Sequence, residues 1–402
     1  DESGNFQQAY ASDVPSFNWQ ARDDYPSRVK EWRLFLNDNF NYTYTLSDVN
    51  TDQDNDNRWV NHATTPLSDG YYNWYVQAVD HAGNVTHSSD TAHFGVDLSP
   101  PNINHSNPLT TVDENTTSPA INVTFYDAAS GVQSGWLNYR RSGSGGGFVV
   151  VDLLSGPVNI PGSDIKAEGL EYFIETVDNV GNHGYWPSDT TFHSVRVRSE
   201  DPITTSQRWS SGIPGGTDST NYLFFSIPFE VSNAKSAITT VMGPPDEFNY
   251  RLYAYNNGWQ ENPSSITMGN AYFFIYDPDK YPDNPNLSFD FGTGVSTPTD
   301  PPYGVNVSSG QWKFFGSPYN FNVSLDNVYT EDGTNVRDAG SIYTWSGSWS
   351  SVSTLQPWSG YIYKSGGATK LNIDGRGGSF GKMAKVLVDP DNVAMDAAEW
   401  TV

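Results

Sequence analysis

The chain has 402 residues and no cysteine, and aromatic residues make up 14% of it. Its formal net charge of -25 argues against a nucleic-acid-binding protein and against a binder of anionic membranes, since both need a basic surface. Only 17% of the residues are charged, and Gly, Pro, Ser, Thr and Asn separate the apolar runs, which is typical of an all-β protein with many turns. No apolar run approaches the roughly 18 residues of a transmembrane helix.

Residues 1–98 form the first predicted unit, a fibronectin type III or immunoglobulin-like sandwich. Val29–Leu36 is an expected strand, with Trp32 and Leu34 on one face and Arg33 and Phe35 on the other. Tyr71–Val79 is the expected central strand. The consecutive prolines Pro100 and Pro101 lack backbone donors, so strand pairing should stop there and a linker should follow.

Residues 99–200 form the second predicted unit, because the central strand recurs there. Tyr72–Asn84 reads YNWYVQAVDHAGN, and Leu170–Asn182 reads LEYFIETVDNVGN. Each run is rich in aromatic and β-branched residues and ends in Asp-x-x-Gly-Asn, the pattern of a strand that enters a tight turn. A repeat of about 100 residues is the size of one β-sandwich, so the sequence predicts two tandem immunoglobulin-like sandwiches.

Residues 201–402 form a third, different unit with an internal repeat of its own. Phe225–Phe229 matches Phe315–Tyr319, and the two half-repeats span about 203–296 and 303–402. Each half has few strands with which to close a core, so we predict a single pseudo-repeated β domain. The predicted fold class is therefore all-β, with two tandem immunoglobulin-like β-sandwiches followed by this domain.

The central strand of the first unit carries a spaced pattern formed by Leu67, Asp69, Gly70, Tyr72, Trp74, Val76, Ala78, Asp80, Ala82, Gly83 and Asn84. Through this pattern the first unit resembles the fibronectin type III and immunoglobulin-like repeats of bacterial surface proteins. The second unit resembles a sister repeat through Gly131-Val132, Tyr139-Arg140 and Gly169–Ile174. The resemblance implies a sandwich fold and a cell-surface setting, and it assigns no ligand, because such repeats host many functions.

Two segments of the third unit, Trp312–Tyr319 and Leu355–Tyr361, carry motifs of another group. Through them this unit resembles the β-rich module that precedes the sorting region in cargo proteins of bacterial type IX secretion. Ser317 stands where that module usually has Asn. The resemblance implies secretion, and we expect the chain to be a segment of a longer polypeptide, since no signal peptide follows Asp1.

No catalytic set is recognisable in the sequence. There is no cysteine nucleophile and no His-Glu-x-x-His motif, and no Gly-x-Ser-x-Gly elbow sits after an expected strand. Glu residues are sparse and fall mostly in expected loops, which does not favour the carboxylate pair of a glycosidase. We predict that the chain is not an enzyme, and we name no catalytic residue.

One loop has the pattern of a calcium ligand set, with oxygen-bearing side chains at alternate positions: Asp48, Asn50, Asp52, Asp54 and Asp56. Ca²⁺ prefers six to eight hard oxygen ligands, and carboxylates this close repel one another without a counter-ion. The alternative is a solvated polar loop. A second, smaller candidate group is Asp277 with Asp279 and Asp283.

The repeated acids Asp80 and Asp178 have two interpretations. As turn residues, they would accept backbone N–H bonds while the following Gly takes a positive φ. As ligands, they would hold calcium at a domain junction. We favour the turn role, and calcium is the candidate cofactor of the chain.

Aromatic residues of the third unit are candidates for stacking on sugar rings. Tyr343, Trp345, Trp349 and Trp358 would do so if they formed an exposed, coplanar platform. The alternative is that aromatic residues at repeated positions belong to the core. Candidate glycosylation sequons occur at Asn41, Asn84, Asn104, Asn115, Asn122, Asn286, Asn306 and Asn322.

These observations favour a non-enzymatic extracellular or cell-surface protein with a structural or adhesive role, such as a stalk or a filament subunit. In the filament version, the N-terminal segment Asp1–Asp13 would add as a strand to a neighbouring copy. The expected partners are other copies of the chain, other surface proteins and glycans. The alternative function is a carbohydrate-binding accessory region of a larger secreted hydrolase or peptidase.

Overall fold

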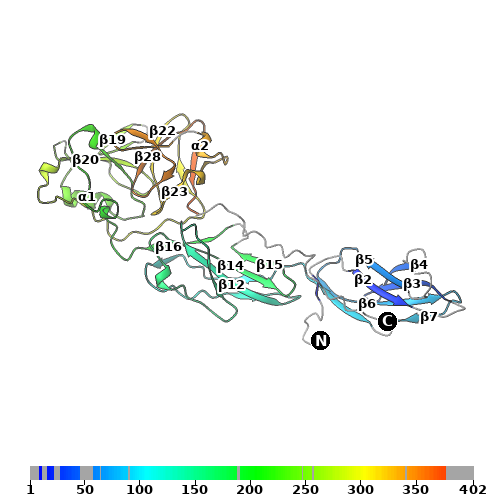
Figure 1. Ribbon diagram of the computed structural model, residues 1–402. Helices are drawn as coiled ribbons and strands as arrows, with labels where there is room; N and C mark the ends of the chain where they lie inside the picture. The colour runs from blue at the N-terminus through cyan, green and yellow to red at the C-terminus, as the bar shows by residue number, and fades with distance from the viewer. Residues whose placement is uncertain are drawn as a thin grey trace.

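The structure is a computed structural model that describes residues 9–10, 16–21, 28–45, 58–63, 65–88, 91–187, 191–246, 248–255, 258–339 and 342–376. It consists of three β-rich units in a row, coloured blue, cyan to green, and green to red in Figure 1. The predicted all-β fold class is confirmed. Within the described ranges, no helix has the length and apolar character needed to cross a bilayer.

The first unit is a two-sheet β-sandwich. Its strands are β1 (Ala9–Tyr10), β2 (Ser16–Ala21), β3 (Val29–Leu36), β4 (Asn39–Thr45), β5 (Arg58–Ala63), β6 (Gly70–Asp80), β7 (Val85–His87) and β8 (Ala92–Val96). The larger sheet has the order β1-β8-β6-β3-β4, with β7 also on β6, and β2 pairs with β5. The large side chains Trp19, Trp32 and Phe94 fill the core of this unit.

The second unit repeats this arrangement. Its strands are β9 (Asn102–Asn104), β10 (Thr111–Asp113), β11 (Thr124–Tyr126), β12 (Val132–Arg141), β13 (Val149–Asp152), β14 (Leu170–Asp178), β15 (His183–Trp186) and β16 (His193–Arg198). The larger sheet has the order β10-β16-β14-β12-β13, with β15 also on β14, and β9 pairs with β11. In both units the outermost strand of the larger sheet, β1 or β10, runs parallel to its neighbour.

The equivalence of the two units extends to a local irregularity. Val29 pairs with Asp80, and Val132 pairs with Asp178. In each case a β-bulge comes directly after this Val, within the same strand. A bulge increases local twist and re-aims nearby side chains. The repeated acid therefore lies at the same place at the end of the central strand in both units. The order of strands and the two facing sheets are those of an immunoglobulin-like sandwich.

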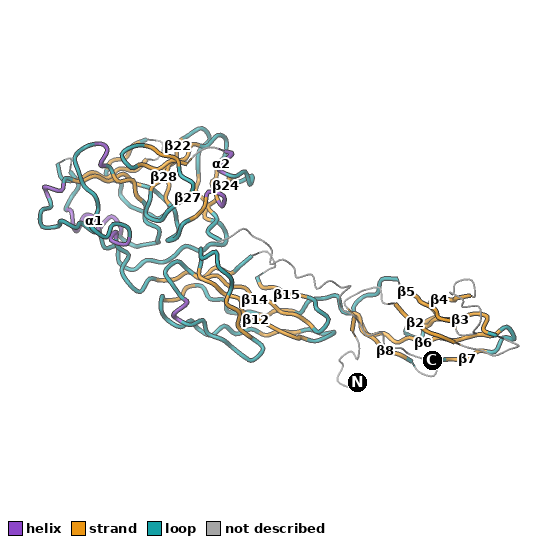
Figure 2. The backbone as a smooth tube through the Cα atoms, in the orientation of Figure 1, coloured by secondary structure: helices purple, strands orange, loops and turns teal. Residues whose placement is uncertain are grey.

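The third unit contains two similar halves. Its elements are β17 (Leu223–Phe225), α1 (Ala234–Met242), β18 (Tyr250–Tyr255), β19 (Trp259–Glu261), β20 (Tyr272–Tyr276), β21 (Tyr303–Asn306), β22 (Trp312–Gly316), β23 (Val323–Ser324), β24 (Val328–Thr330), α2 (Val336–Ala339), β25 (Ile342–Trp345), β26 (Trp349–Ser351), β27 (Thr354–Leu355), β28 (Gly360–Lys364) and β29 (Lys370–Ile373). The sheets β17-β20-β18-β19 and β22-β28-β25-β26 have the same order, one from each half-repeat. Much of the rest of this unit is loop, drawn teal in Figure 2.

The two halves share a core, in addition to one core each. Phe224 and Phe273 of the first half pack with Phe314 and Ile362 of the second. The backbone N–H of Ser226 donates to the carbonyl of Trp358 at 3.1 Å, and that of Gly316 donates to the carbonyl of Gly269 at 3.0 Å. These two bonds occupy corresponding positions of the repeat, so each half closes the other, as a pseudo-two-fold domain requires.

The helix α1 was not anticipated from the sequence. Ala234, Ile238 and Met242 recur at every fourth position and are buried against the core of the first half. Gly243, with φ of 75°, ends the helix. A helix of so few turns depends on this packing, because isolated short helices are marginal in water.

Part of the N-terminal segment proposed as a donor strand is already paired within its own unit. Ala9 and Tyr10 lie beside Gly95 and Val96 as the parallel pair of β1 and β8. These two residues are therefore not loose in the described structure, which removes part of the observation behind the filament version. The remainder of Asp1–Asp13 lies outside the described residues.

Candidate functional site

The repeated acids form the turns that the sequence predicted. Oδ1 of Asp80 accepts the backbone N–H of Asn84 at 2.7 Å, and Oδ2 accepts its side-chain amide at 2.6 Å. Asp178 accepts the same two donors from Asn182, each at 2.8 Å. Gly83 and Gly181 have φ of 90° and 94°. The turn interpretation of Asp80 and Asp178 is therefore confirmed.

Asp178 also belongs to a carboxylate cluster at the joint between the first and second units. One carboxylate oxygen from each of Asp97, Asp127 and Asp178 lies within 4.8 Å of the other two. Asp97 directly follows β8, Asp127 directly follows β11, and Asp178 ends β14. Asp97 and Asp178 are each 0% exposed, and Asp127 is half-buried. We call these three residues the junction triad.

The linker that carries Asp97 is attached to both units. On the side of the first unit, Asp69 accepts the backbone N–H of Leu98 at 2.8 Å. On the side of the second unit, the side-chain amide of Asn182 donates to the carbonyl of Asp97 at 3.0 Å. Gly184 allows the linker to approach, since a Cβ there would lie 2.5 Å from the carbonyl oxygen of Pro101. These contacts fix Asp97 against Asp178.

The junction triad has negative charge without a positive partner. Within the part of the chain that the structure describes, no Lys, Arg or His side chain forms an ion pair with Asp97, Asp127 or Asp178. At separations within 4.8 Å, each pair of charges repels by about 3 kcal/mol for an effective dielectric constant of about 20. Buried charges in proteins are normally paired or bind a metal ion.

The neutral donors around the triad support its charge without neutralising it. Asp97 accepts the N–H of Ser130 at 2.9 Å, and Asp127 accepts that of Gly131 at 2.7 Å. The hydroxyl of Ser130 is buried and has no hydrogen-bond partner among the described residues. A carboxylate offers about four lone-pair sites, so sites remain for a cation after these bonds. Three carboxylates together are a hard-oxygen donor set of the kind that Ca²⁺ prefers.

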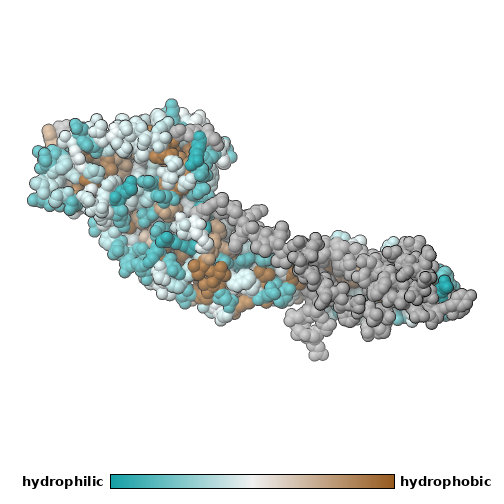
Figure 3. Space-filling model, viewed as in Figure 1, coloured by the Kyte–Doolittle hydropathy of each residue, from teal (hydrophilic) through white to brown (hydrophobic). Residues whose placement is uncertain are grey.

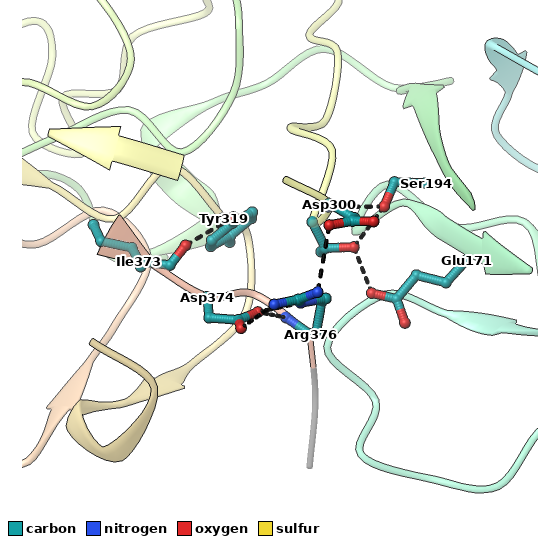
Figure 4. Close-up of polar contacts among 8 residues, drawn as sticks. Glu171, Ser194, Asp300, Tyr319, Ile373, Asp374 and Arg376 are labelled. Carbon is teal, nitrogen blue, oxygen red and sulfur yellow. Dashed lines mark hydrogen bonds and ion pairs between the residues drawn. The ribbon is translucent and has the colours of Figure 1, made fainter. Parts of the chain in front are cut away.

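The joint between the second and third units also holds carboxylates, and there Glu171, Asp300 and Asp374 each pair with an arginine; Figure 4 shows the two pairs of Arg376. Glu171, which is 0% exposed, accepts Nε of Arg140 at 2.8 Å and the hydroxyl of Thr299 at 2.5 Å. Arg376 lies between two carboxylates, donating to Asp374 at 2.7 and 2.8 Å and to Asp300 at 3.3 Å. We call this set the paired joint.

Hydrogen bonds run continuously through the paired joint. The hydroxyls of Ser194 and Thr299 lie 2.8 Å apart, and Ser194 accepts the backbone N–H of Asp300 at 2.9 Å. Burial raises the pKa of Glu171 above its ordinary value, although Arg140 opposes this shift. Burial likewise raises the pKa of Asp300, and Arg376 opposes it. Burial therefore works against these charges, and the arginines offset part of its effect.

Of the triad, only Asp178 was considered as a calcium ligand from the sequence, and there the turn role was favoured; the predicted calcium loop is a different segment. Asp48, Asn50, Asp52, Asp54 and Asp56 lie outside the described residues, so that loop stays a prediction. The side chain of Asp277 accepts the N–H of Asp279 at 3.0 Å and caps a short 3-10 turn, which gives it a local structural role. Asp97 and Asp127 were not proposed as ligands. The available signal was that each directly follows a strand.

The predicted aromatic platform is not present as such. Trp358 is only 2% exposed, because its side chain enters the core of the first half, so its assignment to glycan stacking is wrong. Trp349 is exposed, but its ring meets that of Trp345 at 68°, edge to face rather than coplanar. Tyr343 and Trp345 are half-buried and pack against the shared core of the two halves.

Two of the glycosylation candidates have engaged side chains. The amide nitrogen of Asn84 donates to Asp80, and that of Asn115 donates to Glu200 at 2.5 Å. A glycan on either nitrogen would disrupt these bonds. The exposed candidates are Asn84, Asn104, Asn115, Asn122, Asn286, Asn306 and Asn322, whereas the side chain of Asn41 is outside the described set. Their use stays a prediction.

No family model matches the chain, and no curated protein sequence matches it. Among solved structures, the fibronectin(III)-like modules of CbhA from Clostridium thermocellum are similar at 14% identity and a TM-score of 0.24, over 49% of this chain and 90% of theirs. Chicken VE-cadherin EC1-2 is similar at 12% identity and a TM-score of 0.24, over 49% and 98%. A Ca²⁺-stabilized adhesin of an Antarctic bacterium that binds ice is similar at 14% identity and a TM-score of 0.25, over 91% and 88%.

Proposed function

We propose that the chain is a non-enzymatic extracellular or cell-surface segment with a structural and adhesive role, whose first two units are held in a fixed orientation by calcium at the junction triad. The observation that carries this proposal is the triad itself. Three carboxylates, two of them fully buried, meet at a joint without a cationic side chain from the described residues. A bound divalent cation would replace their repulsion by attraction and join the linker to the second unit.

The surface and the architecture support this setting. Three β-rich units follow one another in a row, which is an arrangement suited to displaying an end unit away from a surface (Figure 1). On the face drawn in Figure 3, the described parts are mostly hydrophilic, with apolar side chains gathered in a few patches. A net charge of -25 favours solubility and disfavours self-association. Calcium sites of extracellular modules bind at about 10⁻⁴ to 10⁻³ M, and we expect the same range here.

Adhesion has more support than self-assembly. The pairing of β1 with β8 within its own unit means that a donor strand would first have to leave that unit. The resemblance of the third unit to type IX secretion cargo is a finer version of the extracellular setting, and it stays a prediction.

Calcium titration of the full chain by isothermal calorimetry tests this proposal. The wild-type chain should bind one more calcium ion than Asp178→Asn, which removes one charge from the triad and keeps an oxygen that accepts the turn's N–H bonds. Asp80→Asn is the matched control, because Asp80 forms the equivalent turn in the first unit. It should bind as the wild type does. Equal calcium binding by Asp178→Asn and wild type would overturn the proposal, and thermal unfolding in EDTA checks that each variant is folded.

A further inference from the structure

The third unit has a groove between its two halves. A cleft of about 680 Å³ lies between the segment Arg208–Phe224 and the region of the β25–β26 hairpin and β27. A second hollow of about 430 Å³ adjoins it, since Arg208, Gln356 and Trp358 line both. The groove therefore extends to both sides of Arg208, and its size is within the usual range of ligand sites, about 300–1,000 Å³.

Arg208 places a positive charge in this groove, which is unusual because the chain as a whole is strongly acidic. Its Nη2 donates to Oε1 of Gln356 at 3.2 Å, and it forms no ion pair with a carboxylate of the described residues. None of the residues that line either hollow is Asp or Glu. Ion pairs with carboxylates are formed instead by Arg33, Arg140, Arg141, Arg196, Arg198, Arg251, Arg337 and Arg376. Arg208 is thus an exposed guanidinium available to an external carboxylate, which it would bind in a two-pronged geometry.

The walls of the groove have the composition of a sugar-binding surface. Trp209, Tyr222 and Trp345 contribute half-buried aromatic rings. The lining also includes hydroxyl and amide side chains, from Thr220, Asn221, Ser346, Ser351, Ser353 and Gln356. Flat rings cover the apolar faces of pyranose rings, and hydroxyls and amides pair with sugar hydroxyls. A groove for an apolar peptide would have more aliphatic side chains than this one.

We propose that this groove binds an acidic oligosaccharide containing uronic acid residues, with a sugar carboxylate on the guanidinium of Arg208. The inference names a ligand class for the adhesive role proposed above. It rests on that proposal for the extracellular setting. It is otherwise independent, because the groove and the junction triad are in different units.

Titration of the full chain with short oligogalacturonates, in EDTA so that calcium bridging is removed, tests the inference. The wild-type chain should bind saturably, and galacto-oligosaccharides of the same length should bind more weakly. Arg208→Gln should lose roughly ten-fold or more in affinity, since a hydrogen bond to a charged group is worth about 1.5–3 kcal/mol. Arg208→Lys keeps the positive charge but not the bidentate guanidinium, so its affinity should lie between those of the wild type and Arg208→Gln.

Arg337→Gln is the matched control. It makes the same charge change in the same unit, and Arg337 pairs with Asp326 at 2.9 Å and does not line the groove. Its affinity should equal that of wild type. The inference is overturned by an absence of saturable binding, by equal loss in both arginine variants, by equal binding of the neutral sugars, or by tighter binding of an acidic peptide. Asp178→Asn should leave uronate binding intact, so failure of this inference and failure of the calcium proposal are distinguishable.

Discussion

The joint between the first and second units and the joint between the second and third units both bury carboxylates, but they differ in what balances the charge. In the paired joint, Glu171 has Arg140, and Asp374 and Asp300 share Arg376. In the junction triad, Asp97, Asp127 and Asp178 have backbone and amide donors alone among the described residues. The first arrangement is complete within the chain. We propose that the second is completed by a bound cation.

The backbone shows the same difference. At the paired joint, Val197 of β16 and Ser296 of the third unit are joined by a backbone hydrogen bond of 2.9 Å, and Ser199 and Gly294 by another of 2.9 Å. The third unit thus continues the hydrogen bonding of the second. At the junction triad, the units are connected through the linker that contains Asp97. The paired joint is thus bridged by backbone hydrogen bonds that need no cation, whereas we propose that calcium holds the linker joint in its orientation.

The largest effect is expected from removing the cation of the paired joint. Arg140→Met keeps apolar contact with Phe148, whose ring centre lies 4.5 Å from the guanidinium, but it leaves Glu171 buried and unpaired. We expect the free energy of unfolding at neutral pH to fall by about 3–5 kcal/mol. Urea unfolding of the full chain measures it.

The matched rescue for that variant is the double substitution Arg140→Met with Glu171→Gln. Removing the unpaired charge should restore most of the lost stability, because a neutral amide is far less unfavourable in that site. A loss below about 1 kcal/mol in the single variant, or a double variant no more stable than the single one, would contradict the role assigned to this pair.

The second effect is calcium removal, which should act on the triad and leave the paired joint unchanged. At a calcium concentration of about a hundred times the dissociation constant, binding should stabilise the wild-type chain by about 2.7 kcal/mol. Differential scanning calorimetry in calcium and in EDTA measures the shift, and small-angle scattering should show a broader distribution of shapes in EDTA. Asp178→Asn should lose the shift, and an undiminished shift in that variant would place the calcium elsewhere.

The local structure of the two sandwiches was predictable because it depends on short-range patterns. Val29–Leu36 was expected as a strand, and β3 has those bounds. The alternation of side chains along Tyr71–Val79 and the Asp-x-x-Gly-Asn turn likewise identified β6 and its end. By contrast, α1 is a short segment with one fully buried apolar residue per turn, and its burial depends on a core assembled from distant parts of the chain.

The site was less predictable, because its members are ordinary turn residues when each is considered alone. Asp97 begins a linker, Asp127 begins a turn and Asp178 ends a strand. Only the packing of the linker against the second unit brings the three carboxylates together. Trp358 was a candidate for sugar stacking, with a core position as the alternative, and the contact between the two halves buries it.

The third prediction gives the junction triad a cationic side chain of its own, as the paired joint already has. Asn182→Lys should provide a positive charge where the amide of Asn182 now donates to the carbonyl of Asp97 and to Asp178. We expect stability in EDTA to rise by about 1.5 kcal/mol, the lower end for a hydrogen bond to a charged group. The calcium-dependent shift in calorimetry should disappear at the same time.

The matched control is Asn84→Lys, which makes the same substitution in the equivalent turn beside Asp80. It should leave the calcium-dependent shift in place, because that turn does not belong to the triad. If Asn182→Lys still needs calcium, or if both lysine variants lose the shift, a missing cation is not what distinguishes the two joints.

The smallest effect concerns pH and belongs to the paired joint. Burial raises the pKa of Glu171 above its ordinary value of 4.5, with Arg140 opposing the shift. Between 4.5 and the raised pKa, the folded chain binds more protons than the unfolded chain, so the contribution of Glu171 to stability increases as the pH falls through this window and is constant below it. Glu171→Gln has no proton to bind at this position, so the pH dependence that Glu171 contributes is removed. The difference in unfolding free energy between wild type and Glu171→Gln, measured in EDTA from neutral pH downward, should therefore shift in favour of wild type on acidification. A difference that shifts the other way would mean that Arg140 outweighs burial, and the paired joint would then be held by its charges more strongly than we infer.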